Sequence, residues 1–482
     1  MPPFVDGNSF ITMSNFTCKL SLRNDREVVY IGANEVEYPG EITLDELTKK
    51  LLARFDYWVG EDKCERPDLE LLGQFLYRVI LPTGELALRK KGNLREQFER
   101  DYAFFLKTRQ TDDRFRLTLE LHKEAAELAT YPWEFLFMSA GGGFFLAGEK
   151  TELILTRFVP NVTPETNEKK EEPLRILVVF SHPQELGNIQ SKATVDVVGD
   201  IEGLAGERIE VRTEDNPTYE DLYELMNGKD ELTDKGKEPS KRLRFKPDIF
   251  HFIGHGEPRR LALIRKAEGI QADKDEGRTP YEADWCDTEQ VLKLFSNHTP
   301  RLVFLHCCDG AKASSIKSLS DMARELVYAK VPIVVAMQYN IKNKDTALFA
   351  KTFYEAIRNN SDIDEAVRDG REKLGQREGQ RPSWGDRRFG TPVVYMQTNS
   401  QRAMVNFPDS REESAAAEIP NRREHCPNPK CDGVMFLNSK FCVYCKEEMM
   451  LCPEGIRNKK YHLMVKSLGF CGECGYREDQ GA

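Results

Sequence analysis

Residues 301–310 read RLVFLHCCDG, a short apolar run that ends in two cysteines, an aspartate and a glycine. A nearly continuous run of Leu, Val and Phe of this length is typical of a strand that is buried on both faces of a sheet. The segment DIFHFIG (248–254) has the same character and continues directly into His255 and Gly256. Both segments therefore predict buried strands with chemically active side chains at their carboxyl ends.

The surrounding sequence repeats this pattern. Further strand candidates are LRILVVF (174–180), RIEVRT (208–213), PIVVAMQ (332–338) and PVVYM (392–396). Amphipathic helical patterns lie between the strand candidates at residues 195–204, 219–226, 288–295, 319–329 and 346–357. Apolar strands that alternate with helices predict an α/β domain with a mostly parallel sheet and helices on both faces. Ligands bind outside the carboxyl ends of the strands in such a sheet, which draws attention to His255 and Cys308.

Two polar stretches divide the chain. They are NVTPETNEKKEEP (161–173) and residues 401–424, which contain the low-complexity REESAAAEIP, and we predict that both are linkers. Residues 1–160 mix amphipathic helix patterns with alternating strand patterns and predict an α+β region. The expected organisation is an α+β region at 1–160, an α/β domain at 174–400, a linker at 401–424 and a small module at 425–482.

The composition excludes several classes of protein. Hydrophobic residues make up 40% and charged residues 31% of the 482 residues, as in soluble globular proteins of several domains. A net charge of -10 argues against a molecule that coats a nucleic acid or an anionic membrane as a whole. The opening MPPFVDGNSF lacks a signal-peptide pattern, and no apolar run of about 18 residues follows. We therefore expect a cytoplasmic protein that has no membrane partner.

His255 and Cys308 form a candidate catalytic pair. A cysteine becomes a nucleophile when an imidazole supports its thiolate, and a small neighbouring residue lets a substrate carbonyl reach backbone N–H donors. Cys308 follows His255 by 53 residues and starts a C-x-G pattern, close to the arrangement in caspases. The alternative is that such a buried cysteine only packs as a small apolar residue. Cys307 alternates to the opposite face and is expected in the core, and we expect His251 and His306 to pack inside their strands.

With these motifs identified, residues 115–400 resemble the CHAT domain, a family of caspase-related peptidases that is also similar to separase. The blocks that carry the resemblance are LATYPWEFLF (128–137), GGFFLAG (142–148), LRILVVF (174–180), HFIGHG (251–256), VFLHCCDG (303–310), and residues 323–338 and 345–357. The resemblance implies a caspase-like fold in which residues 1–160 are the pseudo-caspase-like part. It also implies that His255 is the general base, that Cys308 is the nucleophile, and that the N–H groups of Gly256 and Cys308 form the oxyanion hole.

The sequence departs from the family pattern around the cysteine. Family members usually carry Ser-Ala before it and Thr-Gly beyond it, whereas this chain has His306-Cys307 before it and Asp309-Gly310 after it. These differences leave the pair intact and bear on substrate preference. Asp345 resembles an acidic position that binds a basic substrate side chain in relatives. The alternative is that Asp345 caps the helix TALFAKTF.

The resemblance implies a regulated cysteine endopeptidase that cleaves a partner protein in prokaryotic defence or programmed cell death. The Cys308 thiolate would attack a peptide carbonyl, His255 would protonate the departing amine, and water would hydrolyse the thioester. The alternative is a scaffold that binds protein or nucleic acid without catalysis. The presence of both His255 and Cys308 favours the peptidase.

Seven of the twelve cysteines lie in residues 426–482, an odd number that cannot pair evenly as disulfides. The ligands predicted for a first tetrahedral zinc ion are Cys426, Cys431, Cys442 and Cys445. The ligands predicted for a second ion are Cys452, His462, Cys471 and Cys474, with His425 or a water as the alternative to His462. We therefore expect two structural zinc ions in a module that resembles a zinc ribbon. Such modules bind proteins or nucleic acids, and both kinds of activating partner remain open.

Overall fold

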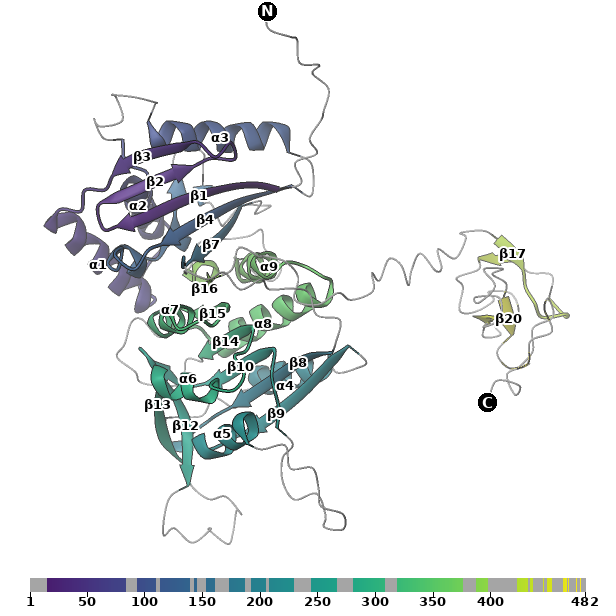
Figure 1. The fold of residues 1–482 in the computed structure, drawn as a ribbon. Helices are drawn as coiled ribbons and strands as arrows, with labels where there is room; N and C mark the ends of the chain where they lie inside the picture. Colours follow the sequence, from purple (N-terminus) through teal and green to yellow (C-terminus); the bar gives the residue numbers. More distant parts are fainter. Residues whose placement is uncertain are drawn as a thin grey trace, which may run out of the picture. The chain divides into compact units, whose positions relative to one another are not determined.

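The computed structural model (Figure 1) divides into two compact units, Met1–Asn406 and Phe407–Ala482. The residues that the structure describes in the first unit are 15–83, 93–109, 113–138, 143–144, 153–160, 173–186, 192–204, 208–228, 244–266, 281–307, 319–375 and 387–397. Those that it describes in the second unit are 423–431, 434–436, 445, 449–452, 463–465, 467, 474 and 477.

The described part of the first unit is built on one sheet of eleven strands in the order β3-β2-β1-β4-β7-β16-β15-β14-β10-β8-β9 (Figure 1). Its N-terminal strands are β1 (Asn15–Asn24), β2 (Glu27–Ile31), β3 (Glu37–Glu41), β4 (Arg114–Leu121) and β7 (Leu153–Phe158). Its other strands are β8 (Leu174–Phe180), β9 (Ile209–Asp215), β10 (Ile249–Gly254), β14 (Leu302–Cys307), β15 (Ile333–Met337) and β16 (Pro392–Met396). The strands of residues 1–160 thus continue the sheet that the central strands begin.

The direction of the strands changes at the middle of this sheet. Strands β9, β8, β10, β14 and β15 are parallel to one another, as the sequence predicts. Strand β16 runs antiparallel to β15, and β7, β4 and β1 run parallel to β16. The carboxyl ends of the central strands therefore lie at one edge of the sheet, and those of the N-terminal parallel strands lie at the opposite edge.

Helices connect the strands. Those of the N-terminal region are α1 (Glu46–Gly60), α2 (Arg66–Ile80) and α3 (Leu94–Thr108). Those of the central region are α4 (Lys192–Glu202), α5 (Tyr219–Asn227), α6 (Thr288–Leu294), α7 (Ser320–Tyr328), α8 (Asn343–Arg358) and α9 (Ile363–Gly375). Among the described residues, no helix is both long and apolar enough to cross a membrane.

The central helices cover both faces of the sheet. Helices α4, α8 and α9 pack in one row, and α5, α6 and α7 pack in another. Successive side chains of a strand point to opposite faces. In β10, the His251 ring hydrogen-bonds Tyr354 of α8, whereas the ring of the neighbouring Phe250 packs on Phe295 at the end of α6. The two rows therefore lie on opposite faces, which confirms the predicted mostly parallel sheet between two helical layers.

Short strands complete the first unit. Strands β5 (Phe137–Met138) and β6 (Gly143–Phe144) form a small antiparallel pair. Strands β11 (Gly256–Glu257), β12 (Arg260–Lys266) and β13 (Tyr281–Asp287) form an antiparallel sheet of three strands directly after β10. Four 3₁₀ helices also lie among the described residues: η2 (Leu128–Thr130), η3 (Trp133–Phe135), η5 (Gln184–Leu186) and η6 (Arg387–Gly390).

The second unit contains two short antiparallel pairs among its described residues. Strand β17 (Arg423–His425) pairs with β18 (Val434–Phe436), and β19 (Met449–Leu451) pairs with β20 (Leu463–Val465). Its buried apolar cluster contains Met449, Leu463 and Val465 beside Cys426.

Candidate active site and metal centre

The carboxyl ends of β10 and β14 lie side by side. The two strands pair in parallel, and their last pair is Gly254 with Cys307. His255 directly follows Gly254 and is fully buried. The predicted nucleophile Cys308 directly follows Cys307 in the sequence and lies outside the described residues, as does the side chain of Cys307. The structure thus describes the two strand ends up to the residue that precedes the predicted nucleophile.

The backbone around His255 is held firmly. The His255 carbonyl accepts a hydrogen bond from the Ala262 N–H at 3.0 Å, and Gly256 pairs with β12 in the hairpin that follows. Gly254 leaves no room for a side chain, because an added Cβ would lie 2.5 Å from the Phe252 ring. These contacts fix the main chain on both sides of His255, which is the support that a catalytic imidazole requires.

His251 and His306 lie on the sheet face that α8 covers, and both are fully buried. The Tyr354 hydroxyl is 3.0 Å from His251 Nδ1, the His251 ring stacks on Phe304 at a centroid distance of 4.3 Å, and the His306 ring centroid is 5.7 Å away. Burial lowers the pKa of His306 to about 3 and lowers the pKa of His251 well below its ordinary value. Both imidazoles are therefore neutral and packed, as the sequence predicts.

A second polar pair lies at the same edge of the sheet. His182 follows β8 and Asp215 ends β9, and His182 Nε2 lies 3.1 Å from Asp215 Oδ1. The Asn216 side-chain oxygen accepts the backbone N–H of His182 at 2.9 Å. This pair is not predictable from the sequence, because His182 and Asp215 stand in polar segments that carry no recognisable motif.

Asp345 lies in the first turn of α8 and is buried. The interpretation of Asp345 as a helix cap is wrong, because α8 begins earlier and its N-cap is Lys342. An Asp345 carboxylate oxygen instead lies 3.2 Å from Nη1 of Arg388. The guanidinium of Arg388 therefore compensates the charge that the sequence assigns to substrate binding.

The Glu134 carboxylate of the YPWEF motif is fully buried and contacts Gln338, the first residue after β15. Its oxygens accept hydrogen bonds from Arg157 Nε and Gln338 Nε2, both at 3.0 Å. Burial raises the pKa of Glu134, but the guanidinium groups of Arg157 and Arg371 together outweigh this effect and hold the pKa below its ordinary value. The YPWEF motif alone does not predict that Glu134 is a buried acceptor for Arg157 and Gln338. A charged residue within an apolar segment is the signal that could have revealed it.

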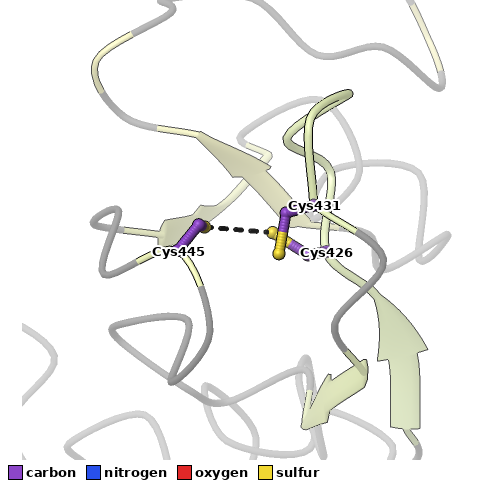
Figure 2. Close-up of side chains that lie close together, drawn as sticks. All are labelled: Cys426, Cys431 and Cys445. Atoms are coloured by element: carbon purple, nitrogen blue, oxygen red, sulfur yellow. Dashed lines mark hydrogen bonds between the residues drawn. The ribbon is translucent and has the colours of Figure 1, made fainter.

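Three of the predicted zinc ligands converge in the second unit (Figure 2). The Sγ atoms of Cys426, Cys431 and Cys445 all lie within 4.8 Å of one another, and those of Cys426 and Cys445 are 3.7 Å apart. Two thiolates bound to tetrahedral zinc at about 2.3 Å are about 3.8 Å apart, so the arrangement fits the ion. The fourth predicted ligand, Cys442, lies outside the described residues.

A second pair of cysteines repeats this geometry. The Sγ atoms of Cys452 and Cys474 are 3.5 Å apart. The other two predicted ligands, His462 and Cys471, lie outside the described residues. His425, the alternative ligand, is exposed at the end of β17. The described thiols thus separate into two groups, as two ions per chain would require.

A family model for the CHAT domain matches residues 73–409, which is more than half of the chain. A search of curated proteins found no match. The match ends before Cys426, the first cysteine of the second unit, so the likeness of that unit to a zinc ribbon stays a prediction.

Solved structures give weaker similarities. Two structures of the Saccharomyces cerevisiae separase–securin complex, at 3.0 and 2.6 Å resolution, match with TM-scores of 0.41 and 0.36 and identities of 11% and 9%. Both alignments cover 80% of this chain, which spans only 30% of the chain that it matches. A structure of pro-sf-caspase-1 matches with a TM-score of 0.26 and 11% identity, over 50% of this chain and 97% of the other.

Proposed function

Because the chain belongs to the CHAT domain family, we propose that it is a caspase-like cysteine endopeptidase in which His255 is the general base and Cys308 the nucleophile. The observation that carries the proposal is the register of β10 and β14. Gly254 pairs with Cys307, and the next residues along the two strands are His255 and Cys308. Neighbouring strands are about 4.8 Å apart, which is compatible with the hydrogen-bond reach that a base and its nucleophile need.

In the proposed reaction, His255 accepts the proton of the Cys308 thiol, and the thiolate attacks the carbonyl carbon of the scissile peptide bond. The N–H groups of Gly256 and Cys308 stabilise the oxyanion that forms. The C–N bond then breaks, and the imidazolium returns its proton to the departing amine. Water hydrolyses the thioester with His255 as base and regenerates the thiol.

Asp345 is the proposed recognition residue for a basic side chain before the scissile bond. Its carboxylate is buried and already paired with Arg388, so a substrate guanidinium or ammonium would take the place of Arg388 as its partner. Such an exchange keeps the charge of the buried carboxylate compensated. A neutral substrate side chain that displaced Arg388 would leave this charge uncompensated. The proposed substrate is therefore a partner protein that is cut after Arg or Lys.

The proposed setting is the cytoplasm of a prokaryotic cell, in defence or programmed cell death. The two groups of thiols in the second unit would hold structural zinc, with the ligands that the sequence predicts. Zinc supplies folding free energy at sites of this kind, and no step of the peptide hydrolysis passes through it. The unit would bind an activating protein or a nucleic acid.

Cleavage of a peptide library tests the proposal. Wild-type protein should cut peptides with a basic residue before the scissile bond, and Cys308→Ala should abolish cleavage. The matched control is Cys307→Ala, which removes the adjacent thiol and should leave cleavage intact. Cys308→Ala should also trap the partner protein. Full biological activity of Cys308→Ala would instead favour the non-catalytic scaffold.

A further inference from the structure

The loop that follows β15 is hydrogen-bonded to η3 and to the end of η6 through its first residue. It covers residues 338–342 and leads into α8, which begins at Asn343 and carries Asp345 in its first turn. The Gln338 side-chain Nε2 donates to Glu134 Oε2 at 3.0 Å and to the Gly390 carbonyl at 2.6 Å. The Gln338 N–H donates to the Thr391 carbonyl at 2.9 Å. The loop therefore starts from a fixed position.

The second residue of the loop is tied to α1. The Tyr339 hydroxyl donates to Asp56 Oδ1 at 2.6 Å, and its ring packs on Phe135 at a centroid distance of 6.2 Å. Tyr339 is 1% exposed. Burial and the Asp56 carboxylate raise the pKa of Tyr339 well above its ordinary value, so the hydroxyl keeps its proton and acts as donor.

The short helix η6 closes the arrangement. The Arg387 guanidinium lies 5.8 Å from the centroid of the Tyr339 ring, and Arg387 Nε donates to Asp62 Oδ1 at 3.1 Å. The neighbouring Arg388 pairs with Asp345 in the first turn of α8, directly after the loop. The loop is thus held at its beginning by Glu134 and at its second residue by Asp56, both of which come from the N-terminal region.

We propose that Asp56 and Glu134 are positioning residues for peptide binding, because they hold loop 338–342 and thereby the start of α8, where Asp345 faces the substrate. This inference rests on the proposed function of Asp345. A loop that is ordered before binding spares the substrate the cost of ordering it. Both acceptors are carboxylates, whose hydrogen bonds are stronger than those of neutral acceptors. The N-terminal region is then part of the substrate site.

The variant Tyr339→Phe tests the inference, since it removes only the hydroxyl that reaches Asp56. We expect KM for a peptide with a basic residue before the scissile bond to rise about tenfold, the effect of one lost hydrogen bond to a charged group. The rate of alkylation of Cys308 and kcat should not change. Asp56→Ala should have the same effect and should not add to that of Tyr339→Phe. Asp56→Asn keeps an acceptor and should restore most of the affinity.

The matched control is Tyr30→Phe. Tyr30 is equally buried, and its hydroxyl donates to Asp101 Oδ2 at 2.7 Å between β2 and α3. The control loses the same kind of bond within the N-terminal region and should lower thermal stability without raising KM. An unchanged KM in Tyr339→Phe, with a loss of thermal stability like that of the control, would show a merely structural role and overturn the inference.

Hydrogen exchange separates this inference from the proposed function. If the wild-type protein cuts no peptide, the proposed function fails, and exchange at residues 338–348 decides whether Asp56 holds the loop. Faster exchange there in Tyr339→Phe than in Tyr30→Phe supports the positioning role. Equal exchange in the two variants overturns it.

Discussion

The two units of the chain differ in the size of the buried apolar cluster that their described residues form. In the first unit, called the α/β unit below, one continuous cluster of buried apolar side chains extends from Phe16 in β1 to Tyr395 in β16. In the second unit, called the cysteine-rich unit below, the buried apolar cluster among the described residues consists of Met449, Leu463 and Val465 around Cys426. If the thiols of this unit bind zinc, as we propose, metal binding supplies a large share of its folding free energy. The two units should therefore respond to different perturbations.

Removal of zinc is the perturbation with the largest expected effect. Structural zinc sites contribute on the order of 10 kcal/mol or more, which exceeds the stability of a small module. We expect a strong chelator to unfold residues 425–482 and to leave the thermal transition of the α/β unit in place. Hydrogen exchange on both units measures this difference. Metal analysis of untreated protein should return two zinc ions per chain.

A pair of cysteine variants sharpens this experiment. Cys445 belongs to the first group of converging thiols, so Cys445→Ser should reduce the bound zinc from two ions to one. Cys64 lies between α1 and α2 in the α/β unit, and Cys64→Ser should retain both ions. Protection of residues 425–482 that survives chelation would contradict the comparison, because the unit would then have a source of stability other than metal.

Truncation in the apolar core should act on the α/β unit alone. Phe304 of β14 is fully buried, and its ring contacts Phe349 and Phe353 of α8. Phe304→Ala should cost about 3–5 kcal/mol, because it leaves a cavity in addition to the lost burial. Thermal unfolding of the α/β unit measures the loss, and the zinc content should not change.

The control for this variant is Phe104→Ala on α3. Phe104 is 58% exposed, so its removal should change the free energy of unfolding by no more than about 0.5 kcal/mol. Equal losses for the two variants would mean that the tight packing between β14 and α8 does not stabilise the α/β unit.

The sequence predicts the central strands well, because burial on both faces produces an apolar run with clear ends. The predicted strand 248–254 is observed as Ile249–Gly254, and every residue in it is buried. The helix predicted at 346–357 is observed as Asn343–Arg358. Its start was missed because the first three residues are polar and do not contribute to an apolar pattern. The pairing of β7 with β16 was not predictable, since a strand does not reveal its partner across such a distance in the chain.

The candidate site shows the same division. Local motifs indicate His255, Cys308 and the cysteine groups, because their chemistry depends on short spacings that a sequence displays. The hydrogen bonds that hold loop 338–342 have no such signal in the sequence. Asp56 and Tyr339 are 283 residues apart, and Glu134 and Gln338 are 204 residues apart. A buried carboxylate becomes recognisable as a positioning group only when the fold shows which donors reach it.

Mild acid is the last perturbation that should distinguish the two units, because it should destabilise the α/β unit through its buried imidazoles. The pKa of His306 in the folded protein is about 3, against about 6.5 when unfolded. Below pH 6.5 the unfolded chain therefore binds a proton that the folded chain excludes. The stability due to neutral His306 is fully present above pH 6.5 and is lost as the pH falls toward 3, by about 1.4 kcal/mol per pH unit.

His306→Leu should remove this part of the acid sensitivity while it retains an apolar side chain beside His251. Denaturant unfolding of the α/β unit between pH 6.5 and pH 4 should show a slope that is smaller by about 1.4 kcal/mol per pH unit in the variant than in the wild type. A wild-type slope in His306→Leu would mean that this imidazole is protonated without unfolding. Acid sensitivity of the α/β unit would then have to come from groups other than the histidine packed beneath the strand ends.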